Sequence, residues 1–532
     1  MKKRDVRIFI LLGLLAAASV SAYFLLADIN PAPDEVRGVS FGRSLDAPAA
    51  LETKEHALSD GGTFEMEALP VKKIIAGNEI SMYGYNGQIP GPTLRVRQGS
   101  SLTVNFKNGL DVDTTVHWHG LRLRNEFDGV PGVTQDAVGP GEKFTYVLDF
   151  PDAGVYWYHP HVREDFQQEM GLYGNIIVEP RDPNYYNGAD SEEAMILDDV
   201  RIRNGDLDFF SDEYVSYALM GRFGNVMLAN GREDYGLSVG RGEKVRLYVT
   251  NAANTRVFNV SIEGQEMALV GDDSGRYERD AVADSFVIAP SERRIVEVLF
   301  DRPGTYRIFH RTPESEYVMG SVVVSDKTKA GRAVHELSPS PDIRGEVASI
   351  GDYLNGAPDI EMSLESRLSG MMGRMSGGSA GHIMPDGSMM GGSMEEEESG
   401  PIEWEDEMAM MNSMSNTENT KWIIRDAKTG KENDNLVYDA KVGDLRKIRI
   451  FNNPDSAHPM QHPIHLHGQR FLVLDKDGTP NNNLAWKDTV LVERGSYVDL
   501  LVDFKNPGDW LVHCHIPEHM ESGMMATFKV SA

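Results

Sequence analysis

A chain of 532 residues, 41% of them apolar and 25% charged, has an ordinary globular composition but is too long for a single hydrophobic core, so we expect three domains. The formal net charge of −29 argues against nucleic acid as a partner, because a phosphate-binding surface needs clustered Lys and Arg. An acidic surface suits cations better, although it mostly serves solubility.

The first 30 residues predict export. A basic segment that ends at Arg7 precedes the uncharged stretch 8–27, which is longer than a usual signal h-region and just long enough to span a bilayer. We expect residues 1–30 to be a signal peptide with small residues for cleavage up to Ala22, or else a retained N-terminal membrane anchor. Either alternative places the rest of the chain in the periplasm or another extracytoplasmic space.

An internal repeat follows. The passages 96–120, 239–264 and 442–468 each run from a glycine turn through alternating apolar residues to a second glycine. A second shared passage reaches Gly154, Gly304 and Gly508, each of which precedes a β-rich run. Short alternating strands bounded by Gly, Pro and Asn predict an all-β chain, built from one repeated Greek-key barrel or sandwich.

Histidines pair at i and i+2 in four places along the chain. Ten of the fifteen histidines fall in these clusters, which are His117 and His119; His159 and His161; His462, His465 and His467; and His513, His515 and His519. An isolated histidine is usually structural, as we expect for His56, His335 and His382. Four clusters of this kind predict metal ligands.

Cys514, the only cysteine, lies between His513 and His515. Because successive strand residues point to opposite faces, the two histidines would look toward one metal centre and Cys514 toward another. Two histidines, a thiolate and a weak axial methionine form the ligand set of a blue, electron-transferring copper, and His519 and Met524 follow at matching spacing. A lone cysteine cannot form an internal disulfide, so its thiolate is available to a metal.

The middle repeat lacks these histidines. The positions that match His117 and His119 are Ser261 and Glu263, and Phe309 stands five residues after Gly304 where the other two repeats have histidine. We therefore expect a middle domain without copper ligands, in which His310 is structural.

Residues 360–416 are expected to form a flexible insert. The stretch 369–415 is rich in Gly and Ser and holds eleven of the chain's twenty-five methionines, several of them among glycines where no amphipathic period could bury them. A partly helical lid that packs its methionines is the alternative.

With all four histidine motifs present, the chain resembles the three-domain multicopper oxidases, the family of laccases and bacterial cuprous oxidases of the copper-resistance type, over about residues 65–325 and 417–532. The resemblance implies three cupredoxin-like Greek-key β-barrel domains, which we place at 60–182, 190–327 and 417–532. The first and third would carry the copper ligands of a three-copper cluster, and the third would also carry the blue site.

The resemblance also implies a role for each ligand and a total of four copper ions. The type 2 copper would be held by His117 and His465, one type 3 copper by His119, His159 and His515, the other type 3 copper by His161, His467 and His513, and the blue type 1 copper by His462, Cys514, His519 and Met524.

Two further residues are candidates for the chemistry. Asp128 matches the family's acidic residue beside the cluster and would relay protons, although a turn-forming Asp before a glycine is an equal alternative. Met460 lies where related cuprous oxidases place a methionine near the blue site. Met520 follows the last blue-site histidine, where many bacterial relatives have a glutamate, and Glu518 or Glu521 could replace that acid.

We expect an oxidase that couples one-electron oxidation of its substrate to four-electron reduction of dioxygen to water. The thioethers of the flexible insert favour Cu(I) as that substrate, because soft ligands prefer this ion. Such an oxidase would act in copper tolerance. The near alternative is a laccase-like oxidase of phenols or of other metal ions such as Fe(II) or Mn(II). A more distant alternative is a copper-binding or assembly protein without turnover.

Overall fold

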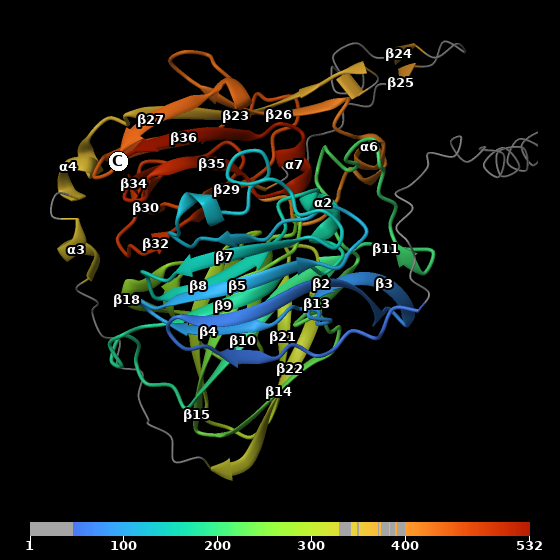
Figure 1. Cartoon of the computed structure of the whole chain (residues 1–532), viewed down its shortest axis with the longest axis vertical. Helices are drawn as coiled ribbons and strands as arrows, with labels where there is room; N and C mark the ends of the chain where they lie inside the picture. Colours follow the sequence, from blue (N-terminus) through green and yellow to red (C-terminus); the bar gives the residue numbers. More distant parts are fainter. Residues whose placement is uncertain are drawn as a thin grey trace, which may run out of the picture. The chain divides into compact units, whose positions relative to one another are not determined.

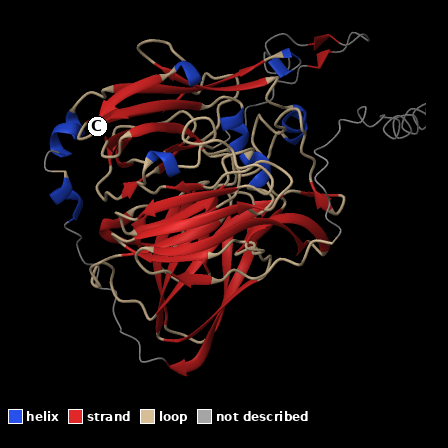
Figure 2. Ribbon diagram, in the orientation of Figure 1, coloured by secondary structure: helices blue, strands red, loops and turns tan. Residues whose placement is uncertain are grey.

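The computed structural model describes residues 46–328, 342–347, 350–370, 372–373, 382–383, 389–390 and 400–532. The expected signal or anchor at 1–30 lies outside these residues, and among the helices that are described none is long and apolar enough to cross a membrane. The described residues of Gly42–Asp208 and Tyr214–Ala532 belong to one compact unit, which contains all the domains described below. Strands dominate this unit and its helices are short (Figure 2).

The first part of the unit is a pair of sheets (Figure 1). One has the order β1 (Glu55–Ala57), β4 (Thr93–Arg97), β9 (Gly174–Glu179), β8 (Gly154–His159) and β6 (His117–His119); the other has the order β3 (Asn78–Tyr85), β2 (Gly62–Ile75), β5 (Ser101–Asn108) and β7 (Lys143–Asp149). Burial alternates strictly along β5, as expected of a strand with one face on a core. The helices η1 (Asn125–Phe127) and α2 (Glu164–Gln167) lie in the connections.

The middle part repeats this arrangement. Its six-stranded sheet has the order β13 (Val226–Ala229), β10 (Ser191–Val200), β15 (Glu243–Asn251), β20 (Arg293–Phe300), β17 (Met267–Asp272) and β18 (Gly275–Ala283), and its five-stranded sheet has the order β14 (Tyr235–Arg241), β22 (Glu316–Thr328), β21 (Gly304–Arg311), β16 (Phe258–Ile262) and β19 (Phe286–Ile288). Apolar side chains of both sheets, such as Val298 and Val322, share one core. The short strands β11 (Ile202–Arg203) and β12 (Asp206–Leu207) form a separate pair.

The third part has a seven-stranded sheet, in the order β26 (Thr420–Asp426), β23 (Ile360–Leu368), β28 (Leu445–Asn452), β34 (Tyr497–Asp503), β30 (Arg470–Lys476) and β31 (Thr479–Pro480), with β32 (Trp486–Lys487) also on β30. Its five-stranded sheet has the order β27 (Val437–Lys441), β36 (Met525–Ser531), β35 (Gly508–Cys514), β29 (His462–Leu466) and β33 (Thr489–Val492). The remaining elements are α3 (Asp342–Glu346), α4 (Ile350–Asn355), α6 (Ala409–Met414), η2 (Asn433–Asn435), α7 (Pro517–Glu521) and the pair β24 (His382–Ile383) and β25 (Met389–Met390).

Strand pairing shows that the three parts share one topology. Each sheet of each part contains a corresponding parallel pair: β2 with β5 and β4 with β9, then β10 with β15 and β14 with β22, then β23 with β28 and β27 with β36. Among the described strands, β1 also pairs with β4 in parallel, and the other pairs in these six sheets are antiparallel, which is the mixture that Greek-key connections produce. The predicted all-β fold of repeated cupredoxin-like domains is confirmed.

The expected insert at 360–416 needs correction at both ends. Residues 360–368 form β23, which pairs with β26 and β28 inside the third part's sheet. Residues 401–416 contact the middle part, where Asn412 accepts a hydrogen bond from the backbone N–H of Met220. Met372 is buried, which agrees with the alternative that this segment packs its methionines. The alternating pattern of residues 360–368 is typical of a strand, but the Gly- and Met-rich stretch that follows dominates the composition of residues 360–416.

Candidate metal centres

Two antiparallel strand pairs place the predicted cluster ligands opposite one another. In the first part, His117 on β6 lies opposite His159 on β8, and in the third part His465 on β29 lies opposite His513 on β35. The middle part has the same register, with Ser261 on β16 opposite Phe309 on β21. The alignment of the three repeats therefore holds residue by residue at these strands.

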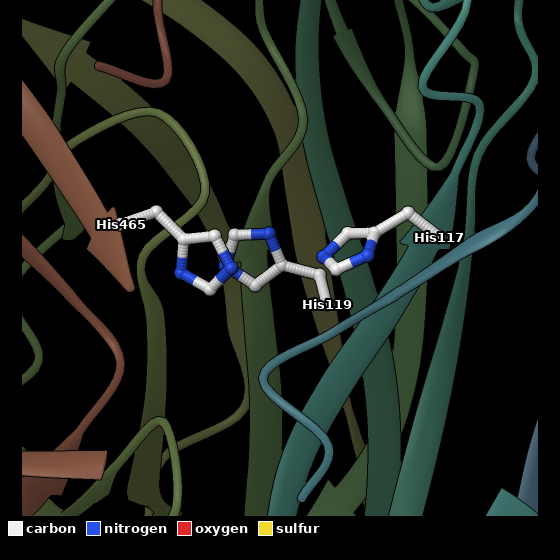
Figure 3. A group of neighbouring side chains, drawn as sticks. All are labelled: His117, His119 and His465. Carbon is white, nitrogen blue, oxygen red and sulfur yellow. The ribbon is translucent and has the colours of Figure 1, made fainter. Parts of the chain in front are cut away.

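Eight buried imidazoles from the first and third parts meet in one place. Those of His119 and His465 stack with ring centroids 3.6 Å apart, and His117 lies beside them (Figure 3). Ligand atoms within 4.8 Å of one another form three trios: His117, His119 and His465; His119, His159 and His515; and His161, His467 and His513. The structure thus brings together every histidine that the resemblance assigned to the three-copper cluster.

Hydrogen bonds to the backbone orient several of these rings. The Nδ1 atoms of His117, His159 and His465 lie 2.7 to 2.9 Å from the carbonyl oxygens of Asp128, Pro160 and Asp488. A ring that donates from Nδ1 keeps the lone pair on Nε2, and the Nε2 atoms of these three histidines are buried without any hydrogen-bond partner. Three unpartnered lone pairs pointing into one buried space fit a metal site.

His119 presents its other nitrogen to the cluster. Its Nε2 lies 3.1 Å from an Asp488 carboxylate oxygen and 2.9 Å from the Thr489 hydroxyl, while its Nδ1 is buried without a partner. His467 and His513 face each other directly, with their Nε2 atoms 2.9 Å apart. Two such nitrogens can share only one proton, so a cation is the natural common partner of their lone pairs.

The pKa values of the cluster histidines suit metal binding. Burial, reinforced by the charges of neighbouring histidines, lowers the pKa of His117, His159, His467 and His515 well below the usual value. These rings are therefore neutral at pH 7, which is the form that binds a metal.

The blue-site candidates form a second, separate group. The Cys514 sulfur lies 3.5 Å from Nδ1 of His462 and 3.8 Å from Nδ1 of His519, and these two nitrogens are 3.3 Å apart. Met524 is buried in the same core, and its carbonyl oxygen accepts a hydrogen bond from the backbone N–H of Cys514. As strand alternation predicts, Cys514 points into the domain core while His513 and His515 point into the histidine cluster.

The chemistry of this group fits copper. Burial raises the pKa of the Cys514 thiol, so the thiolate would not persist in this core without a cation. Two imidazole nitrogens and a sulfur converge with a thioether nearby, which is the donor set that selects copper.

Asp128 lies at the cluster and also in a turn. One of its carboxylate oxygens is 2.8 Å from Nδ1 of His467, the other is buried without a hydrogen-bond partner, and burial raises the pKa of the carboxyl group well above its usual value. Gly129 has a φ of 84°, and a Cβ there would lie 2.0 Å from the Val116 carbonyl oxygen. The two alternatives considered for Asp128, a cluster acid and a turn residue, are therefore compatible.

Two acidic residues that sequence reasoning missed also lie at the cluster. Glu164 is fully buried, with its carboxylate 3.5 Å from His159 Nδ1 and 3.6 Å from His161 Nε2. Asp488 contacts His119, as described above, and is paired with Arg293 of the middle part. Glu164 follows His161 by three residues, and this short spacing is a sequence signal for a carboxylate near the cluster. Asp488 is 369 residues from His119, and no sequence signal connects the two.

Met460 and Trp422 lie in the same buried core as Cys514 and Met524. Met460 is fully buried in the core of the third part. The ring of Trp422 packs against both blue-site histidines, with centroids 4.8 Å from His462 and 4.1 Å from His519. The ring of His458 also lies near Trp422, with centroids 6.3 Å apart.

Comparisons with known proteins agree with this geometry. Residues 71–183, 188–335 and 403–532 each match a family model described as multicopper oxidase. The chain is 27% identical to multicopper oxidase MmcO of Mycobacterium tuberculosis, with 98% of this chain and 96% of that protein covered. It is 25% identical to copper resistance protein A of Escherichia coli, with 92% and 95% covered.

A solved structure supports the same conclusion. The crystal structure of a multi-copper oxidase from Pseudomonas thermotolerans is 27% identical, with a TM-score of 0.66 over 90% of this chain and 100% of that one. The chain belongs to the multicopper oxidase family. It is therefore an oxidoreductase that uses copper, with dioxygen as the electron acceptor and a reducing substrate.

Proposed function

We propose that the protein oxidises Cu(I) to Cu(II) at the expense of dioxygen and serves copper tolerance outside the cytoplasm. Four Cu(I) ions would each give up one electron, and one dioxygen with four protons would yield two water molecules. The periplasmic or extracytoplasmic location rests on the N-terminal segment, either as a cleaved signal or as an anchor.

We propose four copper ions, held as the family resemblance assigns them. The three trios of neighbouring histidines support a type 2 copper on His117 and His465 and two type 3 coppers on the remaining six rings. The trio of His462, Cys514 and His519, with Met524 as the axial ligand, supports the blue copper. Bound copper would supply the one-electron steps at the blue site and the storage of four electrons at the cluster.

The chain itself would contribute a covalent connection between the blue site and the cluster, and a supply of protons to the cluster. Cys514 is bonded through the backbone to His513 and His515, so a single peptide bond joins the blue-site ligand to a cluster ligand on either side. Asp128 holds His467 in place and presents a second, unpartnered carboxylate oxygen, and this supports a role in holding and moving a proton beside the cluster.

One observation supports Cu(I) over bulky substrates: the blue site is buried, and methionine side chains gather near it. His462 is only 1% exposed, so its ring is closed to direct contact with a large organic molecule. Beside it lies a cluster in which Met220 and Met372 are buried and Met408 and Met411 pack against them, which we call the methionine cluster. Thioethers are soft ligands that favour Cu(I).

Oxidation of phenols or of other metal ions is the second candidate. It is favoured by the likeness to laccase-2 of Cryptococcus neoformans, which is 24% identical over 85% of this chain. The test is steady-state oxygen consumption by the copper-loaded protein with Cu(I), a phenol, Fe(II) and Mn(II) side by side. We expect the highest kcat/KM for Cu(I), and a higher value for any of the other three would overturn the proposal.

A further inference from the structure

A nitrogen and a sulfur that belong to none of the sites above face each other beside the blue site. The Nε2 atom of His458 lies 2.9 Å from the sulfur of Met220. The two residues are 238 positions apart, one in the middle part and one in the third part of the same compact unit. Met220 is fully buried and His458 is partly buried.

The backbone on both sides of this contact is fixed by hydrogen bonds. The N–H of His458 donates to the hydroxyl of Ser366, which also donates to the carbonyl oxygen of His458. The N–H of Met220 donates to the side chain of Asn412 in α6. The backbones that carry the two side chains are therefore held next to each other by the fold.

A weak N–H···S hydrogen bond would explain the distance alone, because a thioether sulfur is a weak acceptor. A hydrogen bond does not explain why the contact lies beside other methionines. Met220 belongs to the methionine cluster with Met372, Met408 and Met411, and the latter three lie within the Met-rich residues 371–414 of the chain. Imidazole and thioether together are a soft donor pair of the kind that binds Cu(I).

The position of the pair suits electron transfer to the blue site. The ring of Trp422 is close to both: its centroid is 6.3 Å from that of His458, 4.8 Å from that of His462 and 4.1 Å from that of His519. The Trp422 indole N–H donates to the carbonyl oxygen of Ala218, two residues before Met220, so the same backbone segment holds the tryptophan and the methionine.

We propose that His458 and Met220 hold a single Cu(I) ion as the substrate at the point where electrons enter the blue site. This inference rests on the proposed function and makes it more specific. The ion would lose one electron to the blue copper, and no covalent bond of the protein would form or break. The resulting Cu(II) prefers harder donors than a thioether, which favours its release and the arrival of the next Cu(I) from the methionine cluster.

The experiment uses the copper-loaded full chain and two readouts. Binding is measured with Ag⁺, a soft ion that air does not oxidise, by equilibrium dialysis with metal analysis. Activity is measured as oxygen consumption with Cu(I) and, separately, with a phenol. The variants are Met220→Leu, which keeps the volume, His458→Leu, and His458→Met, which restores a soft donor; the control is Met195→Leu, another fully buried methionine of the middle part.

We expect Met220→Leu and His458→Leu each to lose one equivalent of tightly bound Ag⁺ and to raise the KM for Cu(I) about tenfold or more, the factor that corresponds to about 1.4 kcal/mol of binding free energy. His458→Met should retain the Ag⁺ site. Phenol oxidation and the blue absorption should stay at the wild-type level in every variant, and Met195→Leu should change neither readout.

Unchanged Ag⁺ binding and unchanged KM in both Leu variants would overturn the proposal and leave the contact as a hydrogen bond only. Equal losses for Cu(I) and the phenol with Ag⁺ binding retained would also overturn it. If the wild-type protein binds Ag⁺ through His458 and Met220 but does not oxidise Cu(I), the proposed function fails while the soft-metal site remains.

Discussion

Arg293 of the middle part holds the three parts of the chain together at the copper cluster. Its guanidinium group is completely buried and donates to the Asp488 carboxylate at 2.7 Å, to the Val155 carbonyl oxygen at 2.9 Å and to the Ser291 carbonyl oxygen at 2.8 Å. Its backbone N–H donates to Asp273. Although burial opposes it, this guanidinium group keeps the pKa of Asp488 below the usual value.

Replacing Arg293 by Gln should be among the most destabilising single changes in the chain. It removes the cation from between two buried carboxylates, Asp273 and Asp488, and leaves the Val155 carbonyl oxygen without this donor. Breaking a buried pair by removing one partner costs about 3–5 kcal/mol, because an uncompensated charge remains in the interior. Arg293→Lys should lower the free energy of unfolding by less, because it keeps the positive charge. Some loss should remain, because lysine cannot reproduce the planar bidentate contact.

The assay is urea unfolding followed by tryptophan fluorescence, with the free energy taken from the first transition. Arg307→Gln is the control, because the Arg307–Glu263 pair is at the surface and should contribute little. Copper content per chain is the second readout: Arg293→Gln should also lose cluster copper, since Asp488 orients His119. A destabilisation no larger than that of Arg307→Gln would refute the reasoning.

Three further predictions concern the copper sites and the insert. Cys514→Ser replaces a soft thiolate by a hard hydroxyl, so the blue absorption and all oxygen turnover should disappear; surviving blue absorption would show that the site is wrongly assigned. Asp128→Asn should slow reoxidation by dioxygen while anaerobic reduction by substrate stays near the wild-type rate, and the reverse pattern in stopped-flow absorption would exclude a role at the cluster. Deletion of residues 374–399 removes the short pair β24 and β25 but spares every contact described for the metal sites, so copper loading should persist and Cu(I) oxidation should fall relative to phenol oxidation; equal losses for both substrates would indicate a general structural role.

Much of this protein could be predicted from its sequence because the decisive signals are local. Strand alternation separates Cys514 from its neighbours His513 and His515, and the structure sends them to two different sites as expected. Likewise, the glycine-bounded repeat predicted three similar all-β units, and the parallel pair in each sheet confirms the shared topology. In the middle part, Ser261 and Phe309 occupy the predicted positions because strand register follows from the same short-range pattern.

Only the tertiary structure decided which distant residues support these sites. Asp488 reaches His119 across 369 positions and His458 meets Met220 across 238, and no spacing rule connects residues so far apart. The fold also turned residues 360–368 into a sheet strand and buried Met372, where composition alone indicated an insert without a core. A metal ligand is recognisable in sequence because one strand sets the spacing of its neighbours, whereas an orienting carboxylate or a facing thioether depends on how whole sheets pack against one another.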